Sequence, residues 1–300
     1  MTKILLRSLL GNNGNFSFSY ACLSSFVNYC KNDFELQIFE DGTLTENQIA
    51  KLEKLSKVSI IKKKLRDSII INTLEQYPNC IAFRKIHVLS NKILDTMLYD
   101  NLDFYFLDSD ILFVNNFKFE ENYPQNPIFM KDIESSYSIS FQNFKNYLPY
   151  LFPKINTGFM YFPKNLFDIN KLESIIESRF GTSEIRHKWA EQTMWAFLSS
   201  SLKPSYFHHD QIVMAHPFTS VNKNTIAIHL VTPYRYQFKK LLNTINKQSD
   251  KKSIIIKTYP IKHRLTPRAL ILSIYYYKLQ RKLLRFLKIM PNMEIGRRPI

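Results

Sequence analysis

Residues 104–114 read Phe104-Tyr105-Phe106-Leu107-Asp108-Ser109-Asp110-Ile111-Leu112-Phe113-Val114. The apolar residues before and after the acids are typical of strands buried on both faces of a sheet. A carboxylate in such a run is costly to bury unless it is paired or bound to a metal. The i, i+2 spacing of Asp108 and Asp110 at a strand end can direct both side chains to one point. Since hard oxygen ligands suit Mg²⁺ or Mn²⁺, the stretch predicts a metal site at the end of a central strand.

Strand-like and helix-like segments alternate before this stretch. The expected strands are 4–9, 34–39 and 58–61, and the expected helices are 16–30, 45–55, 79–98 and, later in the chain, 184–198. Such alternation predicts an α/β fold with a Rossmann-like, mostly parallel sheet that is flanked by helices. Ligands bind sheets of this kind outside the carboxyl ends of the strands. The two acids are expected at that edge.

The charge of the chain is concentrated at its C-terminal end. Lys and Arg number 41 against 25 Asp and Glu, which gives a formal net charge of +16. From Lys239 onward, 16 basic and 2 acidic residues give +14, and 25 − 23 = +2 remains for the residues before it. We therefore expect a catalytic domain at 1–238 and a basic, partly amphipathic helical extension at 239–300. A nearly neutral body is unlike a protein that coats nucleic acid.

Residues 265–290 predict a basic amphipathic helix. Cations recur on one face and apolar residues fall largely opposite: Lys278, Arg281, Lys282, Arg285 and Lys288 against Leu279, Leu283, Phe286, Leu287 and Met290. A helix of this kind can lie in the headgroup region of an anionic membrane, which predicts peripheral association. Packing of the helix on the body and a nucleic-acid patch are the two alternatives.

The cysteines indicate the compartment. The three of them, Cys22, Cys30 and Cys80, form no CxxC pair and predict neither a disulfide framework nor a zinc site. The N-terminal residues do not have the pattern of a secretory signal. We expect a cytoplasmic protein that works at the inner face of the membrane.

Four stretches, in this order along the chain, resemble motifs of GT-A type glycosyltransferases, in particular the glycogenin-like and bacterial galactosyltransferase group. Residues 106–113 look like the metal-binding signature of these enzymes, which transfer a sugar from a nucleotide diphosphate. Residues 155–162 resemble the Asn-[Ser/Thr]-Gly strand beside the donor sugar, and 189–193 resemble the acid-Gln pair on a following helix. Residues 227–230 resemble a late strand whose His completes the metal site. The resemblance covers about 1–235 and implies the GT-A fold.

The resemblance also implies roles for individual residues. Asp108, Asp110 and His229 would hold Mn²⁺ or Mg²⁺, and an imidazole ligand suits Mn²⁺ better than Ca²⁺. The catalytic candidates are two acids and an amide: Glu191, Gln192 and Asp132. The donor-binding candidates follow strand ends, lie on the helix before the metal strand or belong to the Asn-[Ser/Thr]-Gly strand: Asn12, Asp41, Arg84, Lys85, Asp108, Ser109, Asn156, Thr157 and Gly158. Gly158 is expected to let the donor approach the backbone closely.

The function implied by these motifs is metal-dependent transfer of a hexose from a UDP-sugar to a glycan or a lipid-linked glycan. A divalent ion would stabilise the negative charge that the departing diphosphate gains. A nucleotidyltransferase is one alternative, although Gly11-Asn12-Asn13-Gly14 is a poor phosphate-binding loop for such an enzyme. A nucleic-acid-binding protein that uses the basic tail is the other, and the nearly neutral body argues against a nucleic-acid partner.

Overall fold

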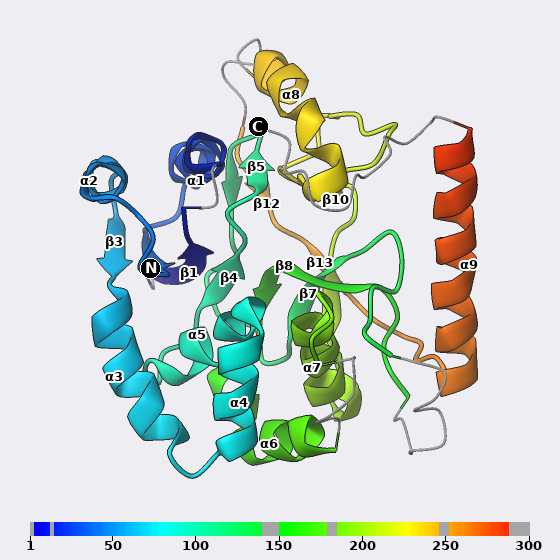
Figure 1. Ribbon diagram of the computed structural model, residues 1–300. Coiled ribbons are helices and arrows are strands. Elements are labelled where there is room, and N and C mark those ends of the chain that lie inside the picture. The colour runs from blue at the N-terminus through cyan, green and yellow to red at the C-terminus, as the bar shows by residue number, and fades with distance from the viewer. Residues whose placement is uncertain (1–2, 13–14, 140–149, 179–184, 246–251, 288–300) are drawn as a thin grey trace.

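A mixed sheet of eight strands lies at the centre of the molecule (Figure 1). The computed structural model describes residues 3–12, 15–139, 150–178, 185–245 and 252–287. The strand order is β13-β9-β7-β8-β4-β1-β2-β3. The strands are β1 (Ile4–Leu10), β2 (Phe34–Glu40), β3 (Val58–Ile61), β4 (Tyr105–Leu107), β7 (Ile128–Lys131), β8 (Ile155–Tyr161), β9 (Ser205–Phe207) and β13 (Thr258–Pro260). Four of the seven neighbouring pairs are parallel, β1 with β2 and β4, β2 with β3, and β7 with β9.

Helices cover both faces of this sheet, as predicted. They are α1 (Phe16–Tyr29), α2 (Glu46–Glu53), α3 (Lys63–Leu74), α4 (Pro78–Ile86), α5 (Asp95–Leu98), α6 (Ile169–Glu177), α7 (Ala190–Leu198), α8 (Phe238–Ile245) and α9 (Pro267–Phe286). Side chains of α3 to α7 share one buried cluster with Phe106 of β4. Side chains of α1 and α2 share another with Tyr105 and Leu107, so β4 is buried on both faces. The prediction of a Rossmann-like, mostly parallel sheet flanked by helices is confirmed.

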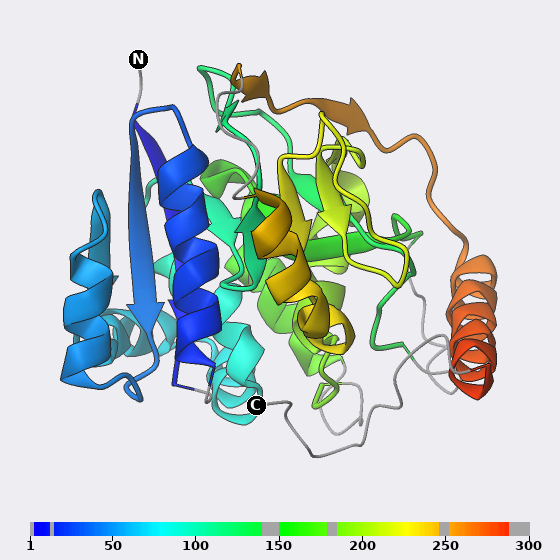
Figure 2. The same cartoon turned by 90° about the horizontal axis from the view of Figure 1, so that it is seen from above.

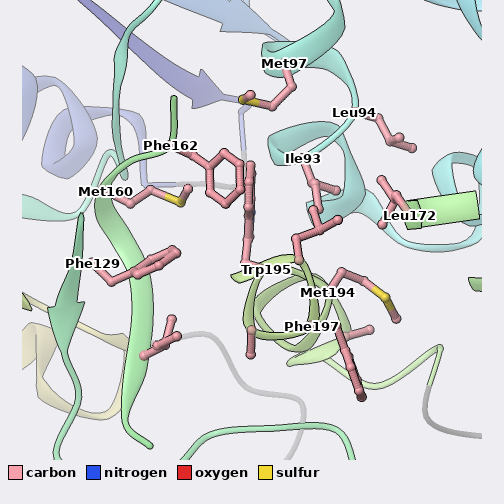
Figure 3. Packing of buried hydrophobic residues seen from close by; sticks show 14 of the residues in the cluster. Ile93, Leu94, Met97, Phe129, Met160, Phe162, Leu172, Met194, Trp195 and Phe197 are labelled. Atoms are coloured by element: carbon pink, nitrogen blue, oxygen red, sulfur yellow. The ribbon is translucent and has the colours of Figure 1, made fainter. Parts of the chain in front are cut away.

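The cluster below the sheet is built around α7 (Figure 3). The indole of Trp195 packs against Phe162, with ring centres 4.9 Å apart. Figure 3 shows Met160 and Phe129 on the sheet side of this helix and Ile93 on the side of α5. All nine residues of α7 are buried, including its polar ones, so the start of this helix is fixed against the sheet.

The apolar run at 104–114 is divided between two sheets. Its first part is β4 of the large sheet, and its second part is β5 (Ile111–Phe113) of a three-stranded sheet. In that sheet β5 pairs antiparallel with β11 (Ala227–His229), which also pairs with β10 (Ile212–Met214). The two acids therefore lie at the crossing from one sheet to the other. The β5–β11 register sets His229 opposite Ile111, directly beside them.

Several helices differ from their predicted bounds. The capped helix at 45–55 is α2, where Thr45 and Gln48 form the reciprocal capping box. The single helix expected at 79–98 is instead α4, a 3₁₀ turn at Val88–Lys92 and α5. Helix α3 was not predicted. Of the helix expected at 184–198, the structure has α7 from Ala190, and 184 itself lies outside the described residues.

The chain after 238 partly joins the body. Strand β12 (Ile254–Ile255) pairs with β6 (Phe117–Lys118), and β13 extends the large sheet at β9. Helix α9 follows at the edge of the molecule, where both views place it (Figures 1 and 2). The division at 238 remains a prediction.

A bilayer span would need a helix that is both long and apolar. Among the described residues, no helix meets both conditions.

Candidate functional site

The turn between β4 and β5 brings three predicted metal ligands together. The backbone N–H of Asp108 donates to the carbonyl of Gly158 at 2.6 Å, which ties the turn to β8. On β11, Nε2 of His229 lies 3.0 Å from Oδ1 of Asp110 and 3.8 Å from Oδ2 of Asp108. One ligand atom from each of the three side chains lies within 4.8 Å of the others. Ser109 occupies the turn between the two acids.

The chemistry of this group fits a divalent metal. It offers two hard carboxylates and one borderline nitrogen, a set that suits Mn²⁺ or Mg²⁺. The imidazole of His229 is buried, and its Nδ1 has no hydrogen-bond partner. Burial lowers the pKa of His229, but the carboxylates of Asp110 and Asp108 together outweigh burial and the pKa is raised. Burial would raise the pKa of Asp110, yet His229 and Arg235 hold that pKa well below its ordinary value.

Gly158 serves this arrangement in an unexpected way. A Cβ at this position would collide with the imidazole ring of His229. The space that the absent side chain leaves is therefore filled by a candidate metal ligand. Close approach of the donor to the Gly158 backbone stays a prediction.

Two cations that sequence reasoning missed compensate the carboxylates. Nζ of Lys92 lies 3.0 Å from Oδ1 of Asp108, and Nη2 of Arg235 lies 2.9 Å from Oδ2 of Asp110. The Lys92 side chain is only 4% exposed and lies over the ring of Phe106. No pattern in the sequence marks Lys92, because the break in the helix that turns it inward is tertiary in origin. Arg235 lies six residues after His229 in the chain, and this closeness to a candidate metal ligand could have marked it as a site residue.

Glu191, in the first turn of α7, lies behind this group. It is buried, and its Oε2 accepts a hydrogen bond from the hydroxyl of Thr157 at 3.1 Å. The same hydroxyl accepts from Nζ of Lys92 at 3.2 Å, so Thr157 links the acid to the metal-site cation. Oε1 of Glu191 is buried without a partner. Burial raises the pKa of Glu191 to about 7; Lys92 opposes this rise and the charge on Asp108 adds to it.

Asp132 and Asn156 form a second polar pair at the ends of β7 and β8. Nδ2 of Asn156 donates to Oδ2 of Asp132 at 3.1 Å. Oδ1 of Asp132 accepts from the backbone N–H of Ile133, and burial raises the pKa of Asp132. Gln192 donates from Nε2 to the carbonyl of Ser136 at 2.7 Å, which anchors α7 to the loop after β7.

The structure does not place Arg84 and Lys85 beside Asp108 and Asp110. The guanidinium of Arg84 forms ion pairs with Asp67 and Asp95, which hold α3, α4 and α5 together. Lys85 is exposed on α4. Among the described residues, no hydrogen bond or ion pair joins either cation to the metal-ligand group. Lys92, on the 3₁₀ turn after α4, pairs with Asp108 instead.

Asn12 and Asp41 follow β1 and β2, and Thr43 links them. The backbone N–H of Asn12 donates to Oγ1 of Thr43 at 2.6 Å, and Oδ1 of Asp41 accepts from the backbone N–H of Thr43 at 3.0 Å. Open α/β sheets bind ligands at this edge. Their contact with a nucleotide remains a prediction, and the neighbouring residues 13–14 lie outside the described part.

A second group of metal-binding residue types lies on the exposed turn between β9 and β10. It consists of His208, His209 and Asp210. Their side chains are 38%, 57% and 50% exposed, so this group is open to solvent. This group offers a natural control for Asp108, Asp110 and His229, which are less exposed.

No protein-family model matches the chain, and no curated protein matches it. Among solved structures, the galactosyltransferase LgtC in complex with donor and acceptor sugar analogues is similar, with a TM-score of 0.52 and 12% identity. The match covers 82% of this chain and 98% of that one. An active-site mutant of LgtC gives the same values, and mouse xyloside xylosyltransferase 1 matches at a TM-score of 0.45, with 11% identity over 76% of this chain and 98% of its own. The chain therefore has the fold of GT-A type glycosyltransferases.

Proposed function

We propose that the chain is a metal-dependent glycosyltransferase that moves a hexose from a UDP-sugar to a hydroxyl of a glycan. The observation that carries the proposal is the meeting of Asp108, Asp110 and His229 at the end of β4. A GT-A type fold and a buried acid behind the same group support it. A structural role alone would not favour two carboxylates and an imidazole at the ligand-binding edge of the sheet.

Each part of the site has a task in this reaction. Mn²⁺ or Mg²⁺, held by the three ligands, would supply Lewis-acid stabilisation of the diphosphate charge. Lys92 and Arg235 add fixed positive charge beside the same carboxylates, where a diphosphate needs it. The Asp132–Asn156 pair offers acceptors and a donor for sugar hydroxyls. These side chains are held by backbone and side-chain contacts before any ligand binds, which lowers the cost of positioning.

Glu191 is the proposed catalytic carboxylate. Its ionised form can either deprotonate the acceptor hydroxyl or stabilise positive charge at the reacting carbon. A pKa of about 7 keeps a large fraction ionised at neutral pH and leaves the group basic enough to take a proton. Both tasks require the same protonation state.

We expect Mn²⁺-dependent release of nucleotide from one UDP-hexose in a panel of UDP-, GDP-, ADP- and dTDP-hexoses. Chelation with EDTA should stop the release, and added Mn²⁺ should restore it, because the diphosphate charge is otherwise uncompensated. The measurement is nucleotide released per unit time with and without a mixture of glycan acceptors. Release of pyrophosphate from a nucleoside triphosphate, with no hydrolysis of any nucleotide sugar, would indicate a nucleotidyltransferase instead.

The outer face of α9 supports peripheral attachment to an anionic membrane at the cytoplasmic side. Apolar side chains recur at helical spacing along this face and are strongly exposed, with Leu272 at 69%, Leu279 at 68% and Phe286 at 82%. Lys282 is exposed beside them. An amphipathic helix with such a stripe and flanking cations can insert its apolar side at the level of the headgroups. We therefore extend the proposal to a lipid-linked glycan acceptor.

Changing Leu279 and Leu283 together to Ser should weaken binding to vesicles of phosphatidylcholine and phosphatidylglycerol at least tenfold. Each buried Leu contributes about 1.5–3 kcal/mol, and a factor of ten needs only about 1.4 kcal/mol. Co-sedimentation measures the effect. The matched control is Leu65→Ser with Ile71→Ser, which removes two exposed apolar side chains from α3 and should leave binding unchanged. Equal loss in both double variants, or equal binding to neutral vesicles, would contradict membrane attachment through α9.

A further inference from the structure

We propose that a group of cations beside the start of α7 binds a phosphate or carboxylate group of the acceptor. The group consists of Lys188, Lys278, Arg281 and Arg285, which we term the cation cluster. Its members come from two segments far apart in the sequence, the residues before α7 and the inner side of α9. The assignment of the anion to the acceptor rests on the proposed function.

Trp189 gives the cation cluster its geometry. This residue directly precedes α7 and is half-buried. The guanidinium carbon of Arg281 lies 5.5 Å from the centre of the indole, and Nζ of Lys188 lies 5.0 Å from it. The ring of His187 packs 5.0 Å from the same indole. Two cations are thus held on one aromatic side chain, which orders them before a ligand arrives.

The positive charge of the cation cluster exceeds the acidity around it. In the part of the chain that the structure describes, the cluster forms one ion pair, between Nη1 of Arg281 and Oε1 of Glu134 at 2.7 Å. Nε of Arg285 is buried without a hydrogen-bond partner. Burial and then the charge of Arg281 lower the pKa of Lys188, and Arg285 adds to the lowering. Mutually repelling cations with one acidic partner form a site that an anion would stabilise.

The cation cluster adjoins both loops that carry the catalytic candidates. Glu134 follows Asp132 by two residues, and its pKa is raised by burial, with Asp132 adding to the rise. Trp189 precedes Glu191 by two residues. Arg281 contacts both Glu134 and Trp189, so it bridges the two loops. An anion held here would lie between the two segments that carry Asp132 and Glu191, on the path of an acceptor to those side chains.

Neither the donor nor the membrane accounts for this charge. The donor diphosphate is already provided for by the metal ligands together with Lys92 and Arg235. The apolar stripe of α9 faces outward, and Arg281 lies half a turn away from Leu279 and Leu283 on the helix, on the side of the body. The remaining substrate is the acceptor. A phosphorylated or carboxylated glycan has the chemistry that the cation cluster fits.

The test is a titration with inorganic phosphate at constant ionic strength, read by tryptophan fluorescence without metal or donor. Trp189 contacts two of the cations, whereas the other tryptophan, Trp195, is buried in the core. Arg281→Gln should weaken phosphate binding about tenfold, because it removes a charge-assisted contact. Glu134→Gln should strengthen binding about threefold, because it removes the competing carboxylate. Trp189→Phe removes the local signal and identifies its source.

These two variants separate binding from structure, because each breaks the same ion pair. A purely structural role for that pair predicts weaker binding in both, and this result would overturn the proposal. Lys282→Gln, on the outer side of α9, is the control and should leave the phosphate titration unchanged. Arg281→Gln should bind vesicles as the wild type does. If it lost as much vesicle binding as the Leu279 and Leu283 double variant, the cation cluster would bind the membrane and the proposal of an acceptor anion site would be overturned.

The kinetic arm compares a disaccharide acceptor with its phosphate monoester. We expect the wild type to have about a tenfold lower KM for the phosphorylated acceptor, and Arg281→Gln to lose that preference. Equal preference in wild type and variant would contradict the assignment to the acceptor. If phosphate affinity falls in Arg281→Gln and rises in Glu134→Gln but the protein transfers no sugar, the anion site stands and the proposed function is wrong.

Discussion

Replacing Asp110 with Asn should reduce Mn²⁺-dependent nucleotide release by about 10³-fold or more. Asp110 is a candidate metal ligand and also pairs with His229 at 3.0 Å, so the change removes a charged ligand and alters its neighbour. The carboxylate holds the pKa of His229 above its ordinary value. Without it, the pKa of His229 should fall, because burial then acts against Asp108 alone, and the imidazole loses its charge-assisted partner. The initial rate of nucleotide release over a range of Mn²⁺ concentrations measures the effect.

The matched control is Asp210→Asn. Asp210 belongs to the exposed group with His208 and His209, which has similar ligand types outside the proposed site. We expect this variant to retain wild-type activity. If Asp210→Asn lost Mn²⁺ dependence while Asp110→Asn kept full activity, the metal site would lie on the exposed turn with His208 and His209.

Stability must be measured alongside activity in Asp110→Asn. The change also leaves the Arg235 guanidinium without its partner, which should lower the free energy of unfolding by about 1–3 kcal/mol. A 10³-fold loss of rate corresponds to about 4 kcal/mol in the transition state. A folded variant that has lost activity therefore separates the two effects. Thermal unfolding in EDTA is the measurement of stability.

Local signals made the first half of the sheet predictable. The strands 4–9, 34–39 and 58–61 correspond to β1, β2 and β3, each with its predicted start. The buried run 104–107 corresponds to β4, and the acid pair does lie at the edge of the sheet. These features depend on periodicity and on the cost of burying carboxylates, which act within a few residues.

The helices around α3 were not predictable in the same way. Arg66 of α3 is buried and binds Asp95 with Nε at 2.7 Å, and Asp95 also binds Arg84. A buried arginine breaks the apolar pattern that marks the inner face of a helix. Its partner lies on another helix, so no local rule finds it. The inward turn of Lys92 has the same cause, since its partner Asp108 lies in the turn after β4.

The orientation of α9 also required the structure. The sequence defines an apolar and a basic face but not which of them contacts the body. The first half of α9 buries Leu270, Ile271 and Ile274 against the body. In its second half Arg281 contacts Glu134 and Trp189, and Leu279, Leu283 and Phe286 are left exposed. The first half therefore packs like an ordinary surface helix, whose apolar face contacts the core, and only the second half leaves apolar side chains exposed.

Changing Glu191 to Gln should remove both the activity and a pH dependence of stability. The pKa of Glu191 is raised by burial from 4.5 to about 7. Between these values the folded state binds more protons than the unfolded state, so stability falls as pH rises. A shift of this size corresponds to about 3 kcal/mol of unfolding free energy, present below pH 4.5 and lost as pH passes about 7. Glutamine cannot ionise, so the variant should lack this decline.

Urea unfolding in EDTA at pH 5, 6, 7 and 8 measures the decline in wild type and variant. Glu173→Gln is the matched control, because burial would raise the Glu173 pKa but the backbone N–H groups of Asn79 and Cys80 hold it below 4.5. That variant should keep the wild-type slope above pH 5.

The rate of sugar transfer in the wild type should increase as pH rises through about 7, because the ionised carboxylate is required. In Glu191→Gln the rate should be about 10²–10⁴-fold lower than in the wild type. A variant that retains both the slope and the rate would place Glu191 outside the catalytic machinery. If Glu191→Gln shows no change of stability with pH but keeps full activity, Glu191 is a buried acid with a raised pKa and no role in catalysis.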